Sequence, residues 1–203
     1  MNLTAELVAL WANYEETHAG CSIEDFCRFY LTKEREKEKE NQFLGGIVPP
    51  KDDQTLAKLC DRITRLYLIY AEAALRRVGL KSFDDFLYIN VIGHLDLPKK
   101  TEVIATNFSE LSSGLLIIDR LLKNGYVTDY QDEIDKRIKR LLLTDKGKSI
   151  LKGCYEELKA VNYLFYNDMP SEDIKLCIQL LSPLELKFSA LLKQHRAEHF
   201  KNI

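Results

Sequence analysis

The segment from Asp135 to Gly147, DKRIKRLLLTDKG, constrains the fold of this chain more than any other. Cations crowd its first half and apolar residues follow, a pattern that indicates the tip of a β-hairpin, its return strand and the start of a long helix. Upstream, residues 109–124 predict a helix that ends at Asn124-Gly125. A helix, a basic hairpin and another helix in this order predict a winged helix-turn-helix.

The composition is that of a globular, mainly helical protein. Hydrophobic residues make up 46% of the 203 residues and charged residues 30%. Only 9 Gly and 5 Pro argue against a loop-rich β architecture. No apolar run of about 18 residues predicts a membrane span. The first residues lack a basic segment and carry Glu6, Glu15 and Glu16, so we expect no signal peptide, a cytoplasmic location and no membrane partner.

The charge is weakly acidic overall and basic in one place. The net charge is −2, which argues against DNA binding, because proteins that bind nucleic acid usually carry a basic surface. Between Lys99 and Lys148, ten Lys/Arg stand against eight Asp/Glu, and four of these cations fall between Lys136 and Arg140. A nucleic-acid-binding surface, if the chain has one, is therefore expected at the hairpin.

Hydrophobic periodicity and helix caps give the order of elements. Expected N-terminal caps are Ser22 (in a box with Asp25), Asp53, Ser82, Ser109 and Thr144. The last helix either restarts at Ser182-Pro183 or is one helix kinked at Pro183. The expected helices are 3–18, 22–42, 54–78, 83–95, 101–106, 109–124, one from 144 and one from 171 to about 200; the expected strands are 126–130 and 138–143.

Two regions are expected along the chain. Residues 1–53 read as an N-terminal helical extension followed by a linker, FLGGIVPPKDD, whose Gly and Pro pairs break helices. Residues 33–42 within it alternate basic and acidic side chains, as a solvated helix face does. Residues 54–203 form the winged helix-turn-helix with long flanking helices.

The cysteines and histidines indicate no metal site, cofactor or catalytic centre. The five cysteines are widely spaced, without a C-x-x-C or a zinc-type cluster with histidine. Cys27, Cys154 and Cys177 fall among apolar residues and are expected to be buried thiols. The four histidines fit no nucleophilic or metal-binding arrangement, so an enzyme is not expected.

The pattern D-x-R, five residues, L-T-x-x-G resembles the wing of the MarR family of bacterial transcription regulators. Here it is formed by Asp135, Arg137, Leu143, Thr144 and Gly147. Upstream, I-D-R-L at 118–121 followed by K-N-G-Y-V is similar to the D-R-L…G-x-V of the same family. The resemblance covers about residues 54–192. It implies a homodimeric, effector-responsive regulator on a palindromic operator in double-stranded DNA. It also implies that the helix before the wing lies in the major groove, the wing reaches the minor groove, and the first and last helices of the module interlock two subunits.

By position, this resemblance assigns the DNA contacts to the helix before the wing and to the wing itself. Arg137 at the loop tip suits a narrow minor groove, and Asp135 can hold its guanidinium. The serines are short donors near a helix N-terminus, although Ser109 is also explained by capping. The candidate DNA-binding residues are Ser109, Ser112, Ser113, Leu116, Lys136, Arg137, Lys139 and Arg140, with Asp135 as the wing-orienting residue.

One departure from the family opens a second reading. Family members often carry Thr-Arg where this chain has Leu115 and Leu116, and a leucine can contact only thymine methyl groups. Gly114 inside the same helix costs about 1 kcal/mol relative to Ala. The alternative is a winged-helix protein–protein interaction module with weak or lost sequence-specific DNA binding.

An effector site is implied only by the resemblance. Tyr67, Tyr70, Arg76 and Tyr88 are candidates to line a pocket for a small anionic ligand, although aromatic residues at helical spacing are also typical of a core. Cys60 occupies a place similar to the peroxide-sensing cysteine of another branch of the family, but it falls on an apolar stripe.

Overall fold

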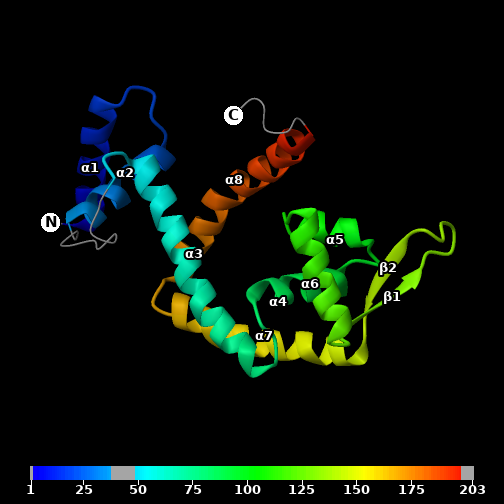
Figure 1. The fold of residues 1–203 in the computed structure, drawn as a ribbon. Coiled ribbons are helices and arrows are strands. Elements are labelled where there is room, and N and C mark those ends of the chain that lie inside the picture. Colours follow the sequence, from blue (N-terminus) through cyan, green and yellow to red (C-terminus); the bar gives the residue numbers. More distant parts are fainter. Residues whose placement is uncertain (1, 38–48, 198–203) are drawn as a thin grey trace. The chain divides into compact units, whose positions relative to one another are not determined.

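The computed structural model describes residues 2–37 and 49–197, which are mainly helical with one small β-hairpin (Figure 1). The expected linker 43–53 and charged run 33–42 therefore lie partly outside the described residues. The helices are α1 Leu3–Thr17, α2 Ile23–Lys37, α3 Asp52–Arg77, α4 Phe83–His94, α5 Lys100–Thr106, α6 Leu111–Lys123, α7 Asp145–Tyr166 and α8 Ser171–Ala197; the strands are β1 Val127–Gln131 and β2 Lys139–Leu143.

The chain divides into two compact units, residues 1–59 and 60–203. In the first unit, α1 and α2 form a helical hairpin around an aromatic cluster. Trp11 meets Phe26 edge-on at 5.3 Å between ring centroids, and Tyr14 stacks on His18 at 4.1 Å. The expected capping box is confirmed: Asp25 accepts hydrogen bonds from the amide and hydroxyl of Ser22, whose oxygen accepts from the Asp25 amide. The apolar stripe that contains Trp11 is thus covered in part by α2.

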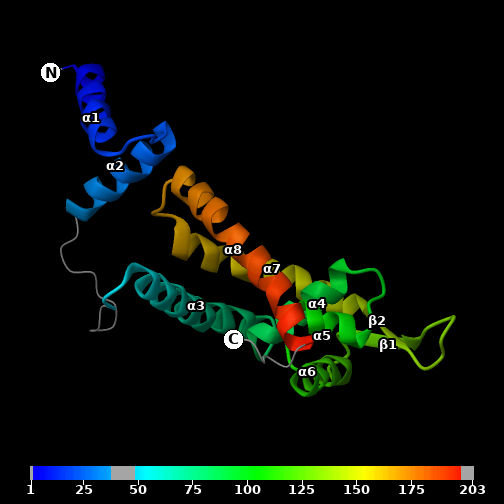
Figure 2. The same ribbon diagram turned by 90° about the horizontal axis from the view of Figure 1, so that it is seen from above.

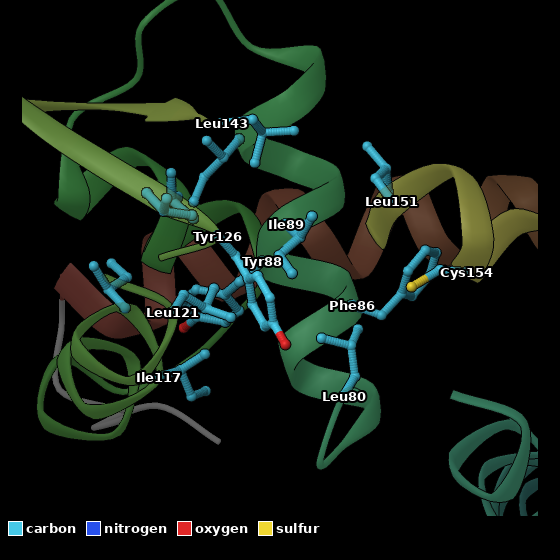
Figure 3. Packing of buried hydrophobic residues seen from close by; sticks show 14 of the residues in the cluster. Leu80, Phe86, Tyr88, Ile89, Ile117, Leu121, Tyr126, Leu143, Leu151 and Cys154 are labelled. Carbon is cyan, nitrogen blue, oxygen red and sulfur yellow. The ribbon is translucent and has the colours of Figure 1, made fainter. Parts of the chain in front are cut away.

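The core of the second unit lies where α4, α5, α6, the hairpin and α7 meet. Buried side chains come from each of these elements, and Figure 3 shows Tyr88 and Ile89 of α4 among residues of α6, β2 and α7. Ser82 caps α4 as expected, accepting from the amide of Asp85. The fully buried members include Leu75, Tyr88, Ile89, Val103, Ile118, Leu121, Leu141 and Cys154.

The two strands pair antiparallel, with Val127 opposite Leu143 and Gln131 opposite Lys139. Leu141 and Leu143 are buried, whereas Leu142 between them is 43% exposed, the alternation expected of a strand with one covered face. Both views show the hairpin extending away from the helices of its own unit (Figures 1 and 2). We call residues 127–143, the two strands and their loop, the wing.

The L-T-x-x-G motif joins the wing to α7. Thr144 caps the helix as expected, because its hydroxyl oxygen accepts from the amide of Gly147 at 3.0 Å. The same oxygen lies 2.7 Å from the carbonyl of Gly125, to which the hydroxyl donates. The backbone of Gly147 lies against the Tyr126 carbonyl, and a Cβ at this position would stand 2.0 Å from that oxygen. Glycine is therefore required here by contact with backbone.

Several expected boundaries are corrected by the structure. Glu110, not Ser109, is the N-cap residue of α6, and its side chain makes no capping hydrogen bond. Asp53 lies inside the first turn of α3 rather than at its cap. The last element is a single helix that contains Pro183. Of the cysteines expected to be buried, only Cys154 is buried, and burial raises the pKa of its thiol to about 11, while Cys27 and Cys177 are exposed.

Long helices of the second unit carry apolar side chains on their exposed surface. In α3, Ile63, Leu66 and Ile69 are 48%, 47% and 64% exposed. In α8 the exposed apolar residues include Ile178, Leu180, Leu184, Leu186 and Phe188. Within the described ranges, none of the helices has the length and apolar character needed to cross a membrane.

Candidate nucleic-acid interface

The two helices of the helix-turn-helix, α5 and α6, pack closely because α6 has a glycine at the contact. A Cβ on Gly114 would lie 2.6 Å from Ile104 of α5 and 2.7 Å from the Tyr88 hydroxyl of α4. That hydroxyl is buried and makes no hydrogen bond of good geometry within the described residues. Burial raises the pKa of Tyr88, and the nearby Ser109 side chain partly opposes this rise. Gly114 therefore has a packing role that offsets its cost to the helix.

The exposed face of α6 presents two of the predicted serines and the predicted leucine, Leu116. Ser112 and Ser113 are exposed, and Leu116 is 69% exposed. Leu115 is half-buried and packs on the core, so it is not available to a ligand of this face. Asp119 is also on the outer surface, where Lys100 of α5 lies 3.7 Å from its carboxylate. The face is thus mixed polar and apolar, with little net charge.

The arginine of the I-D-R-L sequence has an internal role. Arg120 donates from Nε at 2.9 Å and from a terminal nitrogen at 2.5 Å to the carboxylate of Asp85. The Asp85 side chain is 2% exposed and also accepts from the amide of Lys81. A buried carboxylate requires such a partner, so this pair ties the N-terminal turn of α4 to α6.

The loop of the wing is organised by two aspartates. Oδ1 of Asp132 accepts from the amides of Ile134 at 2.9 Å and Asp135 at 3.0 Å. Asp135 in turn accepts from the amide of Arg137 at 3.0 Å. Because the loop amides and then Arg140 bind the ionised form, the pKa of Asp132 falls to about 2. Asp135 orients the loop through this backbone bond rather than through the expected contact with the Arg137 guanidinium.

The predicted cation cluster divides into two pairs with different surroundings. Arg140 is directed inward: it binds the Asp132 carboxylate and donates to the carbonyl of Leu97 at 2.8 Å. Lys139 pairs with Asp129 across the strands at 2.9 Å. Lys136 and Arg137 are exposed, and within the described chain no ion pair involves either side chain. Arg140 therefore has a structural role in the wing, and its contact with phosphate stays a prediction.

The structure adds residues to this face that the sequence did not suggest. Lys99, Lys100 and Thr101 at the start of α5 line a hollow of about 360 Å³ together with Arg137, Ile138 and Lys139 of the wing. We call these six residues the basic hollow. A β-bridge between Lys99 and Arg140 brings the two segments together. The sequence contained the Lys99-Lys100 pair, but nothing in its spacing placed the pair beside the wing.

A large apolar side chain also stands at the tip of the wing. Ile134 is 97% exposed, although Asp132 fixes its backbone amide. Isolated exposed apolar residues are ordinary on protein surfaces. This one, however, lies on a loop ordered by hydrogen bonds and three residues before Arg137. It therefore belongs to the same exposed tip as the unpaired cations.

The four residues proposed for an effector pocket do not line one cavity. Tyr67 packs edge-on against Phe83 and Phe165 and donates to Asn162 at 2.9 Å. Tyr70 contacts Phe165 and is 49% exposed. Arg76 faces Glu72 one turn earlier at 3.6 Å. Tyr88 lies in the core beside Gly114. These are packing and surface positions of the described monomer.

Cys60 is exposed, whereas its place on an apolar stripe predicted a buried thiol.

Comparisons with known proteins show which folds this architecture resembles. The sequence matches no family model and no curated protein. Solved structures do match: FabT of Streptococcus pneumoniae in complex with DNA has a TM-score of 0.59 and 24% identity, over 69% of this chain and 99% of its own. A mutant of MarR from E. coli complexed with operator DNA has a TM-score of 0.60 and 16% identity, over 71% and 99%. CouR of Rhodococcus jostii RHA1 bound to p-coumaroyl-CoA has a TM-score of 0.57 and 18% identity, over 67% and 95%.

These similarities define the class of fold. Other similar structures include the transcriptional regulator SlyA, with a TM-score of 0.63, and a MarR transcriptional regulator from Methanosarcina mazei Go1, with a TM-score of 0.59. The match covers nearly all of each of these proteins. The chain therefore has a MarR-type winged-helix fold, as the wing motif predicted. The helix-turn-helix α5–α6 and the wing are the parts of this fold that carry the candidate interface.

Proposed function

We propose that this protein is a DNA-binding transcriptional regulator of MarR type. The observation that carries the proposal is the basic hollow, where cations of α5 and of the wing converge beside an ordered, cationic loop tip. Two segments that are distant in the sequence thus present ammonium and guanidinium groups to one ligand. A phosphodiester backbone is the ligand that this arrangement suits, because phosphate contacts dominate protein–DNA affinity. Double-stranded DNA, as bound by FabT and MarR, is the proposed partner.

The proposed mode of binding assigns a role to each part of the face. Ser112, Ser113 and Leu116 of α6 enter the major groove, where Leu116 contacts thymine methyl groups. Lys99, Lys100 and Lys136 neutralise phosphates. Ser109, which lies between α5 and α6, contributes at most to a phosphate contact near the turn. Lys139 helps to neutralise the strand facing the hollow while it remains paired with Asp129.

The wing tip is proposed to read the shape of the minor groove. Arg137 inserts where the groove is narrow and its potential most negative. Ile134 enters the same groove, where apolar side chains of other minor-groove proteins insert between base steps. Asp132 and Asp135 hold the loop amides, so the tip is ordered before DNA binds. Pre-ordering reduces the conformational entropy lost on binding.

We further propose that residues 54–203 form the functional module and act as a homodimer on a palindromic site, with residues 1–53 as an extension. The support is the apolar surface of α3 and α8, where side chains such as Leu66 and Phe188 are 47% and 59% exposed. A monomer would leave this surface in water, which favours an interface with a second copy. A twofold dimer would match the symmetry of a palindromic operator.

One alternative function has its own support. Leu111 and Leu116 on α6 and Ile134 on the wing are 56%, 69% and 97% exposed, which suits a protein partner as well as DNA. In that case the winged helix would be a protein–protein interaction module that binds DNA weakly and without sequence preference.

Selection of bound fragments from a random pool of duplex DNA tests the proposal. A palindromic consensus is the expected result and would support both operator binding and dimer symmetry. The affinity for the selected site should fall steeply as salt rises, since cations released from phosphates dominate the dependence. Two results together would instead support the protein-interaction alternative: no motif is enriched in the selected pool, and the amount of DNA that the protein retains does not depend on salt.

A further inference from the structure

A cavity of about 530 Å³ opens between the end of α4, the loop that follows it, strand β2 and α7. It lies within the second unit, and neither α3 nor α8 contributes to it. This volume falls within the roughly 300–1,000 Å³ typical of small-molecule sites. None of the effector residues expected from the sequence lines it. The lining consists of Ile92, Gly93, Leu95, Asp96, Leu97, Leu142, Leu143, Lys148, Leu151, Lys152 and Tyr155.

The chemistry of the lining selects one class of ligand. Its walls are aliphatic, with Leu95 and Leu142 still 41% and 43% exposed and therefore available for further burial. Lys148 and Lys152 stand one helical turn apart on α7 and contribute two ammonium groups. The Lys148 ammonium also lies 3.4 Å from the exposed carboxylate of Asp145, a contact that a ligand carboxylate would share or replace. Asp96 is the one acidic group of the lining, so the charge of the cavity is net positive. An apolar body that ends in a single carboxylate satisfies both features.

The cavity is connected to the wing tip by a continuous series of hydrogen bonds. Leu97 lines the cavity, and its carbonyl accepts from Arg140 at 2.8 Å. Arg140 also binds Asp132, which holds the amides of Ile134 and Asp135 in the wing loop. A ligand against Leu97 therefore contacts the first member of a network that ends at the exposed tip.

Leu97 is a strained point in this network. Its φ is +49°, a left-handed conformation that is rare for a branched side chain, and it precedes Pro98, which disfavours helical backbone at this position. Such a conformation persists only where its surroundings support it. A ligand that covers the Leu97 side chain would add to that support and so stabilise the bonded wing.

We propose that this cavity is an effector site for a small amphipathic carboxylate, and that its occupation orders the wing through Leu97, Arg140 and Asp132. The regulatory role of the site rests on the proposed function. Ligand binding and the order of the wing, however, can both be measured without DNA. The site differs from one built by α3 and α8, because neither of these helices contributes a residue to its lining.

The test uses octanoate as the probe and the full chain without DNA. Calorimetry should detect octanoate binding that is at least about tenfold weaker in the Lys148→Gln/Lys152→Gln variant, since a charge-assisted contact is lost. Lys159→Gln, an exposed change farther along α7, is the matched control and should leave binding unchanged. Octanol should bind less tightly than octanoate. Equal binding by the double variant, or by octanol, would overturn the site.

Coupling is measured separately by amide hydrogen exchange. Octanoate should slow exchange at Ile134, Asp135 and Arg137, and Arg140→Gln should abolish this protection while octanoate still binds. Unchanged or faster exchange in the original protein on saturation would overturn the coupling. If octanoate binds and orders the wing but no DNA is ever retained, the effector site stands and the proposed function fails. If the protein binds DNA but does not bind octanoate, the proposed function stands and the effector site fails.

Discussion

Gly147 of α7 lies so close to Tyr126 at the start of the wing that a Cβ on Gly147 would stand 2.0 Å from the Tyr126 carbonyl oxygen. No side chain is smaller than a methyl group, and a backbone carbonyl cannot move aside without breaking the bonds around it. The same carbonyl accepts from the amide of Thr144 at 3.1 Å. The contact therefore fixes where the wing leaves the helix.

Gly147→Ala should destabilise the protein by several kcal/mol, beyond the roughly 1–3 kcal/mol of an overpacked core, because the clash is with backbone. Thermal or urea unfolding measures the change. Gly153→Ala in the same helix is the matched control: its Cβ would meet no backbone, only the Val78 side chain, with a methyl carbon at 3.1 Å. The gain in helix propensity should leave that variant near the original stability. Similar loss in both variants would contradict this explanation of the motif.

Gly114→Ala should also destabilise the fold, by about 1–2 kcal/mol, since overpacking against Ile104 and Tyr88 outweighs the improved helix propensity. Urea unfolding gives the magnitude. Because the added methyl group would separate α5 from α6, DNA affinity should fall further than stability alone explains. Tyr88→Phe in the same chain removes the hydroxyl oxygen that would lie 2.7 Å from the added carbon, and should recover part of both losses. A Gly114→Ala protein as stable as the original would refute the packing role.

Arg137→Ala should weaken binding to many DNA sequences by roughly 1–3 kcal/mol, because a minor-groove cation is lost. The melting temperature should be unchanged, since an exposed cation contributes little to stability. Fluorescence anisotropy at two salt concentrations measures the affinity, with Lys159→Ala as a control for charge alone. Leu116→Ala should instead shift sequence preference more than overall affinity. Unaltered affinity of the Arg137 variant at both salt concentrations would sink the DNA-binding proposal.

Asp132 should make the order of the wing depend on pH. Its pKa is lowered to about 2, so the ionised carboxylate is favoured in the folded wing. The stabilisation is present above the ordinary carboxylate pKa of about 4 and is lost as the pH falls through about 2. Nuclear magnetic resonance of the Ile134 and Asp135 amides should show this transition. Asp132→Asn should remove it and weaken the amide bonds already at neutral pH; a transition that persists in Asp132→Asn would assign it to another group.

Sedimentation equilibrium should give a mass near twice the 23.5 kDa of one chain at micromolar concentration. The apolar surface of α3 and α8 provides the physical reason. Leu184→Glu together with Phe188→Glu on α8 should shift the protein to the monomer, whereas Lys159→Glu should not. A monomeric mass for the original protein would remove the dimer from the proposal.

Local patterns in the sequence determined the elements and the class of fold. Caps such as Ser22, Ser82 and Thr144 act over three or four residues, so their hydrogen bonds follow from neighbouring sequence. The basic and then apolar pattern of residues 135–143 and the wing motif likewise predicted the hairpin and the helix after it. Ser109 failed as a cap because the turn between α5 and α6 takes one residue more than the pattern suggested.

Only the tertiary structure decided which charged residues face a ligand. The sequence predicted Arg140 as a DNA contact and showed Arg120 only as part of a motif. In the structure they pair with Asp132 and Asp85, since a buried carboxylate requires a partner. The basic hollow joins Lys99 and Lys100 to Arg137 across nearly forty residues, and no local periodicity encodes that contact. In the sequence Gly114 was a cost to its helix and Gly147 was a motif residue. In the structure each is a point of close contact, with α4 and α5 for Gly114 and with the Tyr126 backbone for Gly147. The spacing of residues along the chain specifies local hydrogen bonds such as helix caps. The partners of buried charges and the close backbone contacts depend instead on which distant segments the tertiary structure brings together.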